Sequence, residues 1–178
     1  MNFSLSKLDT WKYQIKAGDR ITLTGTVYTA RDAAHLKLCA LLDQGEPLPF
    51  DLQGTVIYYA GPAGTPPGKI IGSCGPTTSA RMSAFVPRFL SLGIGGIIGK
   101  GEFPNQVKQA FFQAQVPYFS AVGGAGARIA DSIKTLEVVA FPALGCESVK
   151  KLYVEKMPVF VAYDLQGNDI YACAKSSL

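Results

Sequence analysis

Hydrophobic and polar positions follow two different periods along the chain. Residues 21–28 alternate apolar and polar, which predicts a strand with one buried face. From Thr29 or Asp32, either of which could cap a helix, apolar residues recur at helical spacing as far as Leu42. The same criteria predict further strands at 55–60, 93–99, 118–122 and 136–141, and helices from 78, at 104–114 and at 127–133. Pro87 should bend or end the helix that begins at 78, near Ser83.

The end of the chain predicts a closing hairpin, with strands at 158–163 and 170–172 around a turn at 164–169. Strands alternate with helices through the middle of the chain, and hairpin-like strands stand at both ends. This order predicts an α/β fold with mixed parallel and antiparallel sheets. There is no internal repeat and no long linker, so residues 1–178 are expected to form one domain.

Composition excludes several classes of protein. The chain is 48% hydrophobic and 17% charged, which is typical of a compact fold. Its net charge of +4 is spread out, without the basic runs of a nucleic-acid binder. No apolar run approaches the roughly 18 residues that span a membrane, and no cleavable signal opens the chain. A cytoplasmic location is expected, with four free thiols at positions without metal-ligand spacing: Cys39, Cys74, Cys146 and Cys173.

The common enzyme motifs are missing. The glycine patterns at 93–98 and 124–129 both lack the third glycine of a dinucleotide-binding loop, and there is no Walker lysine motif. His35 is the only histidine, which excludes a site of several histidines. A serine–histidine–aspartate triad would have to use His35, and nothing near it resembles a nucleophile elbow.

The stretch 72–81 carries the most informative chemistry. Gly75 and Pro76 break the chain just before Thr77, Thr78 and Ser79, which are good residues to start a helix and leave its first N–H groups facing an anion. Arg81 lies one helical turn beyond Thr77, so the two can share a face. This combination suits a carboxylate or a phosphate. The alternative is an ordinary helix cap with a solvated arginine.

Three cations follow predicted strands: Arg31, Arg81 and Lys100. Loops at the carboxyl ends of strands are where α/β sheets bind ligands. Together with the hydroxyls of Thr77 and Thr78, the three cations suit a substrate with two carboxylates. The alternative for each cation alone is a solvated surface position.

Residues 29–35, 72–82 and 98–101 resemble the iron–sulfur hydro-lyases, specifically the beta subunit or C-terminal domain of class I fumarase and L-tartrate dehydratase. The resemblance covers almost the whole chain. It implies a swivelling β/β/α domain and a separate alpha subunit that holds a [4Fe–4S] cluster through three cysteines. The four cysteines here do not match those ligands, so none is assigned to metal. The chain is expected to be inactive alone and to form a higher oligomer of alpha–beta pairs.

The same resemblance implies roles for individual residues. Arg31, Arg81 and Lys100 match positions that bind the substrate carboxylates, and Thr77 matches a hydroxyl proposed as a catalytic acid or base. Asp32 and His35 are expected to hold Arg31 in place. An open iron of the cluster would act as a Lewis acid on the leaving hydroxyl.

The function implied is that of the beta subunit of a class I fumarate hydratase, which adds water reversibly to fumarate to give L-malate. An L-tartrate dehydratase or mesaconate hydratase subunit is the close alternative, because these enzymes share the carboxylate clamp. A non-catalytic anion-binding domain is the alternative from another class.

Overall fold

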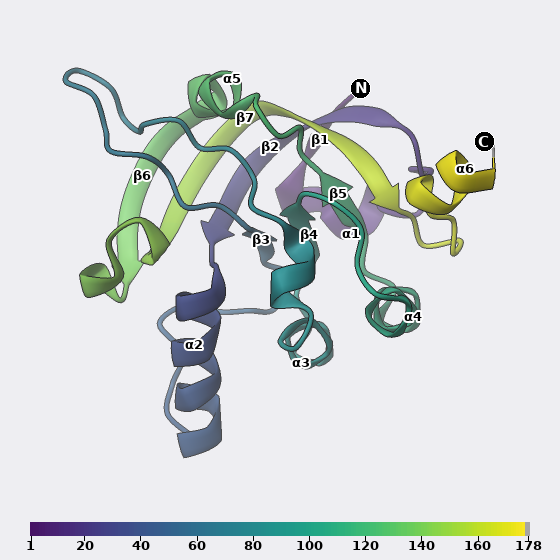
Figure 1. Ribbon diagram of the computed structural model, residues 1–178, viewed down its shortest axis with the longest axis horizontal. Coiled ribbons are helices and arrows are strands. Elements are labelled where there is room, and N and C mark those ends of the chain that lie inside the picture. Colours follow the sequence, from purple (N-terminus) through teal and green to yellow (C-terminus); the bar gives the residue numbers. More distant parts are fainter. Residues whose placement is uncertain (177–178) are drawn as a thin grey trace.

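The computed structural model describes residues 1–176 and contains one seven-stranded mixed sheet in the order β1-β2-β3-β4-β5-β7-β6 (Figure 1). The strands are β1 (Asn2–Ser4), β2 (Arg20–Thr29), β3 (Val56–Tyr58), β4 (Gly96–Gly99), β5 (Tyr118–Ser120), β6 (Ile133–Ala140) and β7 (Val149–Tyr163). The helices are η1 (Leu5–Lys7), α1 (Leu8–Trp11), α2 (Asp32–Gln44), η2 (Ser79–Met82), α3 (Val86–Ser91), α4 (Asn105–Ala114), α5 (Gly126–Ser132), η3 (Pro142–Glu147) and α6 (Ile170–Ser176). The predicted α/β class with mixed strand directions is confirmed.

The sheet curls until it is partly closed. Strands β2, β3, β4 and β5 are parallel neighbours, and β7 runs antiparallel to both β5 and β2. The β2–β7 pairing is long, from Arg20 opposite Phe160 to Tyr28 opposite Lys151. Its register shifts near Gly25, where a side chain would collide with Leu5. The result is a small barrel-like core in which the carboxyl ends of the parallel strands lie at the same edge.

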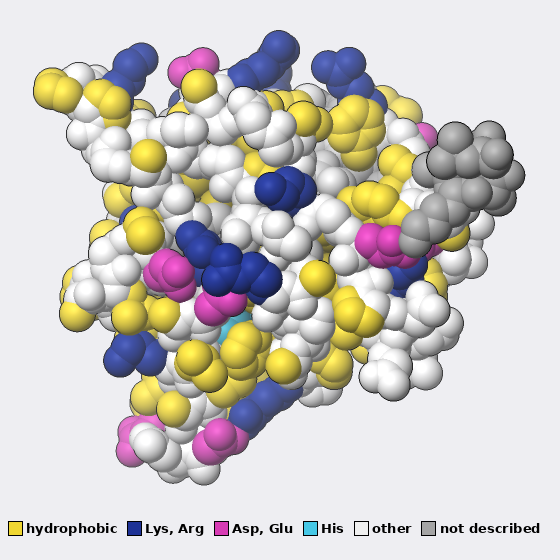
Figure 2. All heavy atoms as spheres, in the orientation of Figure 1, with side chains coloured by type: hydrophobic (Ala, Val, Ile, Leu, Met, Phe, Trp, Pro, Cys, Tyr) yellow, Lys and Arg dark blue, Asp and Glu magenta, His cyan; other side chains and the backbone are white. Residues whose placement is uncertain are grey.

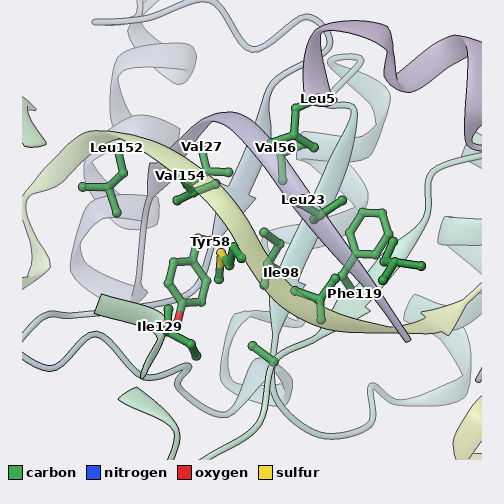
Figure 3. Packing of buried hydrophobic residues seen from close by; sticks show 14 of the residues in the cluster. Leu5, Leu23, Val27, Val56, Tyr58, Ile98, Phe119, Ile129, Leu152 and Val154 are labelled. Carbon is green, nitrogen blue, oxygen red and sulfur yellow. The ribbon is translucent and has the colours of Figure 1, made fainter. Parts of the chain in front are cut away.

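Two hydrophobic clusters fill the two faces of this sheet. The first lies inside the curl, where Leu23, Val27, Tyr58, Phe119 and Val154 pack together with Leu5 from the N-terminal segment (Figure 3). The second lies outside and is covered by α2, α3 and α4, which stand on the same side of the sheet (Figure 1). The alternation in residues 21–28 therefore arises because one face of β2 is buried in the inner cluster, as predicted.

The C-terminal hairpin prediction is wrong in two respects. Strand β7 is 15 residues long and begins at Val149, and the segment after its turn is the helix α6. Only an isolated antiparallel bridge, Tyr163 with Asp169, remains of the expected pairing. A sequence signal for the longer strand did exist, because exposed Lys151 and Tyr153 alternate with buried Leu152 and Val154.

The helix predicted from Thr78 is also divided. The chain forms a single 3₁₀ turn at Ser79–Met82 and then a separate helix at Val86–Ser91, so the break near Ser83 is confirmed. Pro87 occupies the first turn of α3, where its missing N–H costs nothing, so it starts a helix and does not interrupt one.

Within residues 1–176, no helix combines the length and apolar character needed to cross a bilayer.

Candidate functional site

The predicted site residues gather where β2, β3 and β4 end. Arg31 is the second residue after β2, and Lys100 directly follows β4. Thr77 lies next to the end of β3, where its backbone N–H donates to the Tyr59 carbonyl at 2.7 Å. Parallel strands bring their carboxyl ends to one edge, so segments distant in sequence meet there. The long loop between β3 and η2 leaves this edge, extends away from the body and comes back to it (Figure 1).

Arg31 and Arg81 converge on one carboxylate. Asp32 Oδ2 lies 3.1 Å from Arg81 Nη2 and 3.8 Å from Arg31 Nη2, and Arg81 Nε donates to Asp32 Oδ1 at 3.2 Å. The Arg31 side chain is 19% exposed and that of Arg81 is 53% exposed. Figure 2 shows basic side chains gathered beside acidic ones near the middle of this face. The two guanidinium groups therefore lie on the same side of the molecule.

Glu147, at the end of η3, is a contributor that the sequence did not indicate. Its Oε1 lies 3.4 Å from Arg31 Nη2, and its Oε2 accepts the backbone N–H of Ala33 at 3.1 Å. Neither Thr29 nor Asp32 caps α2 as expected: Arg31 takes the cap position without a side-chain hydrogen bond. Glu147 satisfies one of the free N–H groups of the first turn. No local pattern signals such a contact across more than one hundred residues.

Lys150 holds the turn that carries Glu147. The Lys150 side chain is buried, and its Nζ donates to the carbonyls of Gly145 and Cys146 and to Ser148 Oγ at 3.0, 3.1 and 2.7 Å. Burial lowers the pKa of Lys150, and electrostatic interactions with Cys146 and Cys74 offset part of this shift. The placement of Arg31 thus depends on a turn that is itself anchored from within the protein.

Gly61 leaves the space that the Arg31 side chain occupies. A Cβ at Gly61 would lie 2.8 Å from Arg31 Nη1 and 3.2 Å from Arg31 Cδ. We expect Gly61→Ala to displace the guanidinium. If Arg31 binds an anion, as the sequence predicts, the KM for that anion should rise by about tenfold, because a misplaced binding group loses orientation as well as contact. Gly64→Ala is the matched control from the same loop, since nothing lies within 4 Å of a Cβ there. Equal KM values for the two variants would contradict this role for Gly61.

Lys100 lies beside Thr78 on the other side of the same turn. The two residues form an isolated parallel bridge, and the half-buried Lys100 side chain runs over Gly123, where a Cβ would lie 3.0 Å from Lys100 Cδ. The glycine-rich segment 123–126 also packs on the loop before Thr77, with Cys74 N–H donating to the Gly126 carbonyl at 3.0 Å. These glycines allow close packing of the two segments, although they do not form a dinucleotide-binding motif.

The predicted anion site at a helix start is not present in the expected form. Thr78 occupies the cap position of a four-residue 3₁₀ turn and makes no side-chain capping hydrogen bond. A single 3₁₀ turn has little of the dipole of a long α-helix, so positive charge in this site comes from side chains. Thr77 is half-buried and Thr78 is exposed.

His35 contacts Arg31 through the backbone. Its Nδ1 lies 2.9 Å from the Arg31 carbonyl oxygen, which can only accept, so Nδ1 carries the proton. The ring packs against Tyr59, Phe85 and Phe89 at centroid distances of 5.4, 5.2 and 4.9 Å. Within the described residues, Nε2 has no hydrogen-bond partner. Burial lowers the pKa of His35 to about 4, so the histidine is a neutral support for Arg31.

The depressed pKa of His35 makes folding stability depend on pH. Between pH 6.5 and 4 the unfolded chain binds a proton that the folded chain refuses, so stability is lost as pH falls. We expect a loss of about 2 kcal/mol between pH 7 and pH 5 from this group, by the usual 1.4 kcal/mol per pKa unit. His35→Phe keeps an aromatic ring and should remove that part of the slope in urea unfolding. Parallel slopes for the two proteins would contradict it.

No group of three or more histidine, cysteine or acidic side chains within residues 1–176 is arranged to hold a metal ion. Cys39 is half-buried, Cys74 is buried, and Cys146 and Cys173 are exposed. Burial raises the pKa of the Cys74 thiol to about 12, so this cysteine of the 72–81 stretch stays protonated. The described residues therefore offer no ligand set that would fit an iron–sulfur cluster.

The fold and the site define a class: an α/β protein that gathers two arginines, a lysine and neighbouring hydroxyls at the carboxyl ends of parallel strands. Residues 3–174 match the family described as the fumarase C-terminus, and the chain belongs to that family.

Similar proteins fall into two groups. The chain is 45% identical over 161 residues to fumarate hydratase 2 of Leishmania major, covering 89% of this chain but 28% of that protein. It is 43% identical over 160 residues to the anaerobic class I fumarate hydratase of Escherichia coli, covering 29% of that protein. It is 42% identical over 173 residues to the putative L(+)-tartrate dehydratase subunit beta of Methanocaldococcus jannaschii, covering 94% of this chain and 88% of that protein. The chain thus spans less than a third of the length of the fumarate hydratases.

Proposed function

We propose that the chain is the beta subunit of a class I fumarate hydratase, which with an alpha subunit adds water reversibly to fumarate to give L-malate. The observation that carries the proposal is the convergence of Arg31 and Arg81 on a single carboxylate, next to a turn that also contacts Lys100. Membership of the fumarase C-terminus family supports it.

Arg31 and Arg81 bind one substrate carboxylate, and Lys100 binds the other. Arg81 has five N–H donors and uses its Nε and Nη2 on Asp32, which leaves Nη1 for a ligand. Within the described residues, the buried Nε of Arg31 also has no hydrogen-bond partner. Asp32 keeps the two guanidinium groups side by side despite their like charge. Holding both ends of the diacid orients its reacting carbons.

Thr77 transfers the proton at the reacting carbon. A hydroxyl is a weak acid and a weak base in water, so this role needs a desolvated position near positive charge. Thr77 is half-buried and lies on the turn that also carries Arg81. Thr78, the exposed neighbour, contributes a hydroxyl to substrate binding.

In this proposal a [4Fe–4S] cluster belongs to the partner alpha subunit, as the family resemblance implies. The chain acts as one cytoplasmic domain, residues 1–178, of the swivelling β/β/α type. It is inactive without the alpha subunit and assembles into a higher oligomer of alpha–beta pairs.

An L-tartrate dehydratase beta subunit is the second candidate. This chain covers most of the length of two tartrate dehydratase beta subunits, the putative one from Methanocaldococcus jannaschii at 88% and one from Escherichia coli at 80%. Mesaconate hydratase shares the same carboxylate clamp. These substrates differ in the hydroxyl and methyl groups around the shared diacid.

Anaerobic co-expression with the alpha subunit tests the proposal. Turnover of fumarate, L-tartrate and mesaconate by the purified pair should favour fumarate by at least tenfold in kcat/KM. Preference for tartrate would select the second candidate. A colourless protein that forms no complex with a cluster-bearing subunit would contradict both and would favour a non-catalytic anion-binding domain.

A further inference from the structure

A short network of hydrogen bonds joins the turn that carries Thr77 and Arg81 to the loop that carries Lys100. Ser79, which is fully buried, forms both direct links. Its backbone N–H donates to the Lys100 carbonyl at 2.8 Å, and its Oγ accepts the Lys100 N–H at 2.9 Å. The backbones of the two segments are thereby fixed to each other through one residue.

Tyr118, at the start of β5, completes the network. Its Oη lies 2.8 Å from the Gly101 carbonyl and 2.9 Å from Ser79 Oγ. A carbonyl can only accept, so the single Tyr118 proton is donated to Gly101, and the Ser79 hydroxyl donates to Tyr118 Oη. The chain of bonds therefore starts at the N–H of Lys100 and ends at the carbonyl of Gly101. Every polar group in it is satisfied, which makes a buried network rigid.

The surroundings leave this network little freedom. The Tyr118 ring is buried and packs against Phe103, Phe111 and Tyr163 at centroid distances of 5.1, 5.7 and 4.9 Å. Burial raises the pKa of Tyr118 well above its usual value, so it remains a donor. Ser79 Oγ occupies the space where a Cβ at Gly99 would stand. That close approach requires glycine at the end of β4.

We propose that Ser79 and Tyr118 are positioning residues, which set the placement of Lys100 relative to Thr77 and Arg81 so that all three act on one diacid. This role rests on the proposed function. Neither residue needs to touch the substrate, since both are buried beneath the two segments they join. A displacement of a reacting group by about 1 Å can lower the rate as much as 10²-fold. A rigid link between the two loops would therefore increase the rate by keeping their side chains in place.

Ser79→Ala in the assembled alpha–beta pair tests the proposal. We expect kcat/KM for fumarate to fall by about tenfold or more. Ser132→Ala is the matched control: Ser132 is also buried, and its hydroxyl bonds only to the Ile129 carbonyl of its own helix at 2.6 Å. The control should keep kcat/KM within about twofold at a similar loss in Tm. Tyr118→Phe, which keeps the packed ring, should reproduce the Ser79→Ala effect. Equal kinetics for the Ser79 and Ser132 variants would overturn the proposal.

A double-mutant cycle separates positioning from general destabilisation. If Ser79 acts by placing Lys100, then Lys100→Ala should cost much less in the Ser79→Ala background than in the wild type. Strictly additive effects would count against the proposal.

Succinate titration of the assembled pair by calorimetry gives a readout without turnover. Ser79→Ala should weaken binding by about tenfold, and an unchanged Kd would overturn the positioning role. A wild-type pair that turns over none of the three substrates would contradict the proposed function, while this titration would still test Ser79.

Discussion

Arg81→Ala should lower kcat/KM of the assembled enzyme by about 10²- to 10³-fold. Truncating one partner of a buried, hydrogen-bonded charge pair costs about 2–5 kcal/mol, and each 1.4 kcal/mol is a factor of ten. In the proposed complex the substrate carboxylate covers Arg81 and forms such a pair with it. The loss should be this large because, in the proposed function, Arg81 binds the substrate, and it also pairs with Asp32 at 3.1 and 3.2 Å. Steady-state kinetics on the anaerobic complex measures it.

Arg88→Ala is the matched control for Arg81. Arg88 also forms an ion pair with an acidic residue of α2, Asp43, at 2.7 Å, and its side chain is 39% exposed. The Arg88→Ala variant should be nearly as stable as the wild type, as expected when a surface ion pair is removed, and its activity should be unchanged. Substantial activity in Arg81→Ala, or an equal loss in Arg88→Ala, would count against the substrate-binding assignment.

Thr77→Val should lower kcat by about 10³-fold while the Kd for a dicarboxylate stays within a few-fold of the wild type. Positioned acid–base groups contribute about 10²- to 10⁴-fold, and valine keeps the shape of threonine without its hydroxyl. Single-turnover kinetics together with succinate titration separates the chemical step from binding.

Thr77→Ser provides the complementary variant, because it keeps the hydroxyl and loses only a methyl group. It should restore most of the rate that Thr77→Val loses. Normal turnover in Thr77→Val would rule out proton transfer by Thr77, and a large loss of succinate binding would instead assign it to substrate binding.

Much of the fold could be predicted because its elements are locally periodic. The alternation of residues 21–28 and the helical spacing after Asp32 each record the burial of one face. The break near Ser83 followed from Pro87, although the proline proved to start the second helix. The end of the chain was predicted less well, because lysines at the start of β7 mask the alternation of residues 151–154 and α6 lacks a distinct helical signal.

Some residues of the candidate site could likewise be predicted from the sequence, and others could not. Arg31, Arg81 and Lys100 were recognisable as cations that follow strands, since the order of elements along the chain already implies a common edge. Glu147 and Tyr118 were not recognisable, because their contacts with the site cross sequence separations that no local pattern records.

By itself, the sequence determined the α/β class, the family resemblance of the 72–82 stretch and the chemical type of each candidate ligand-binding side chain. These properties depend on residue identity and short-range spacing. Only the tertiary structure decided that Asp32 holds two arginines together, that Ser79 joins the turn to the Lys100 loop, and that β7 closes the sheet onto β2. The reason is physical: strand register and side-chain convergence minimise the free energy of the whole packed core, and that minimum is not a sum of local preferences.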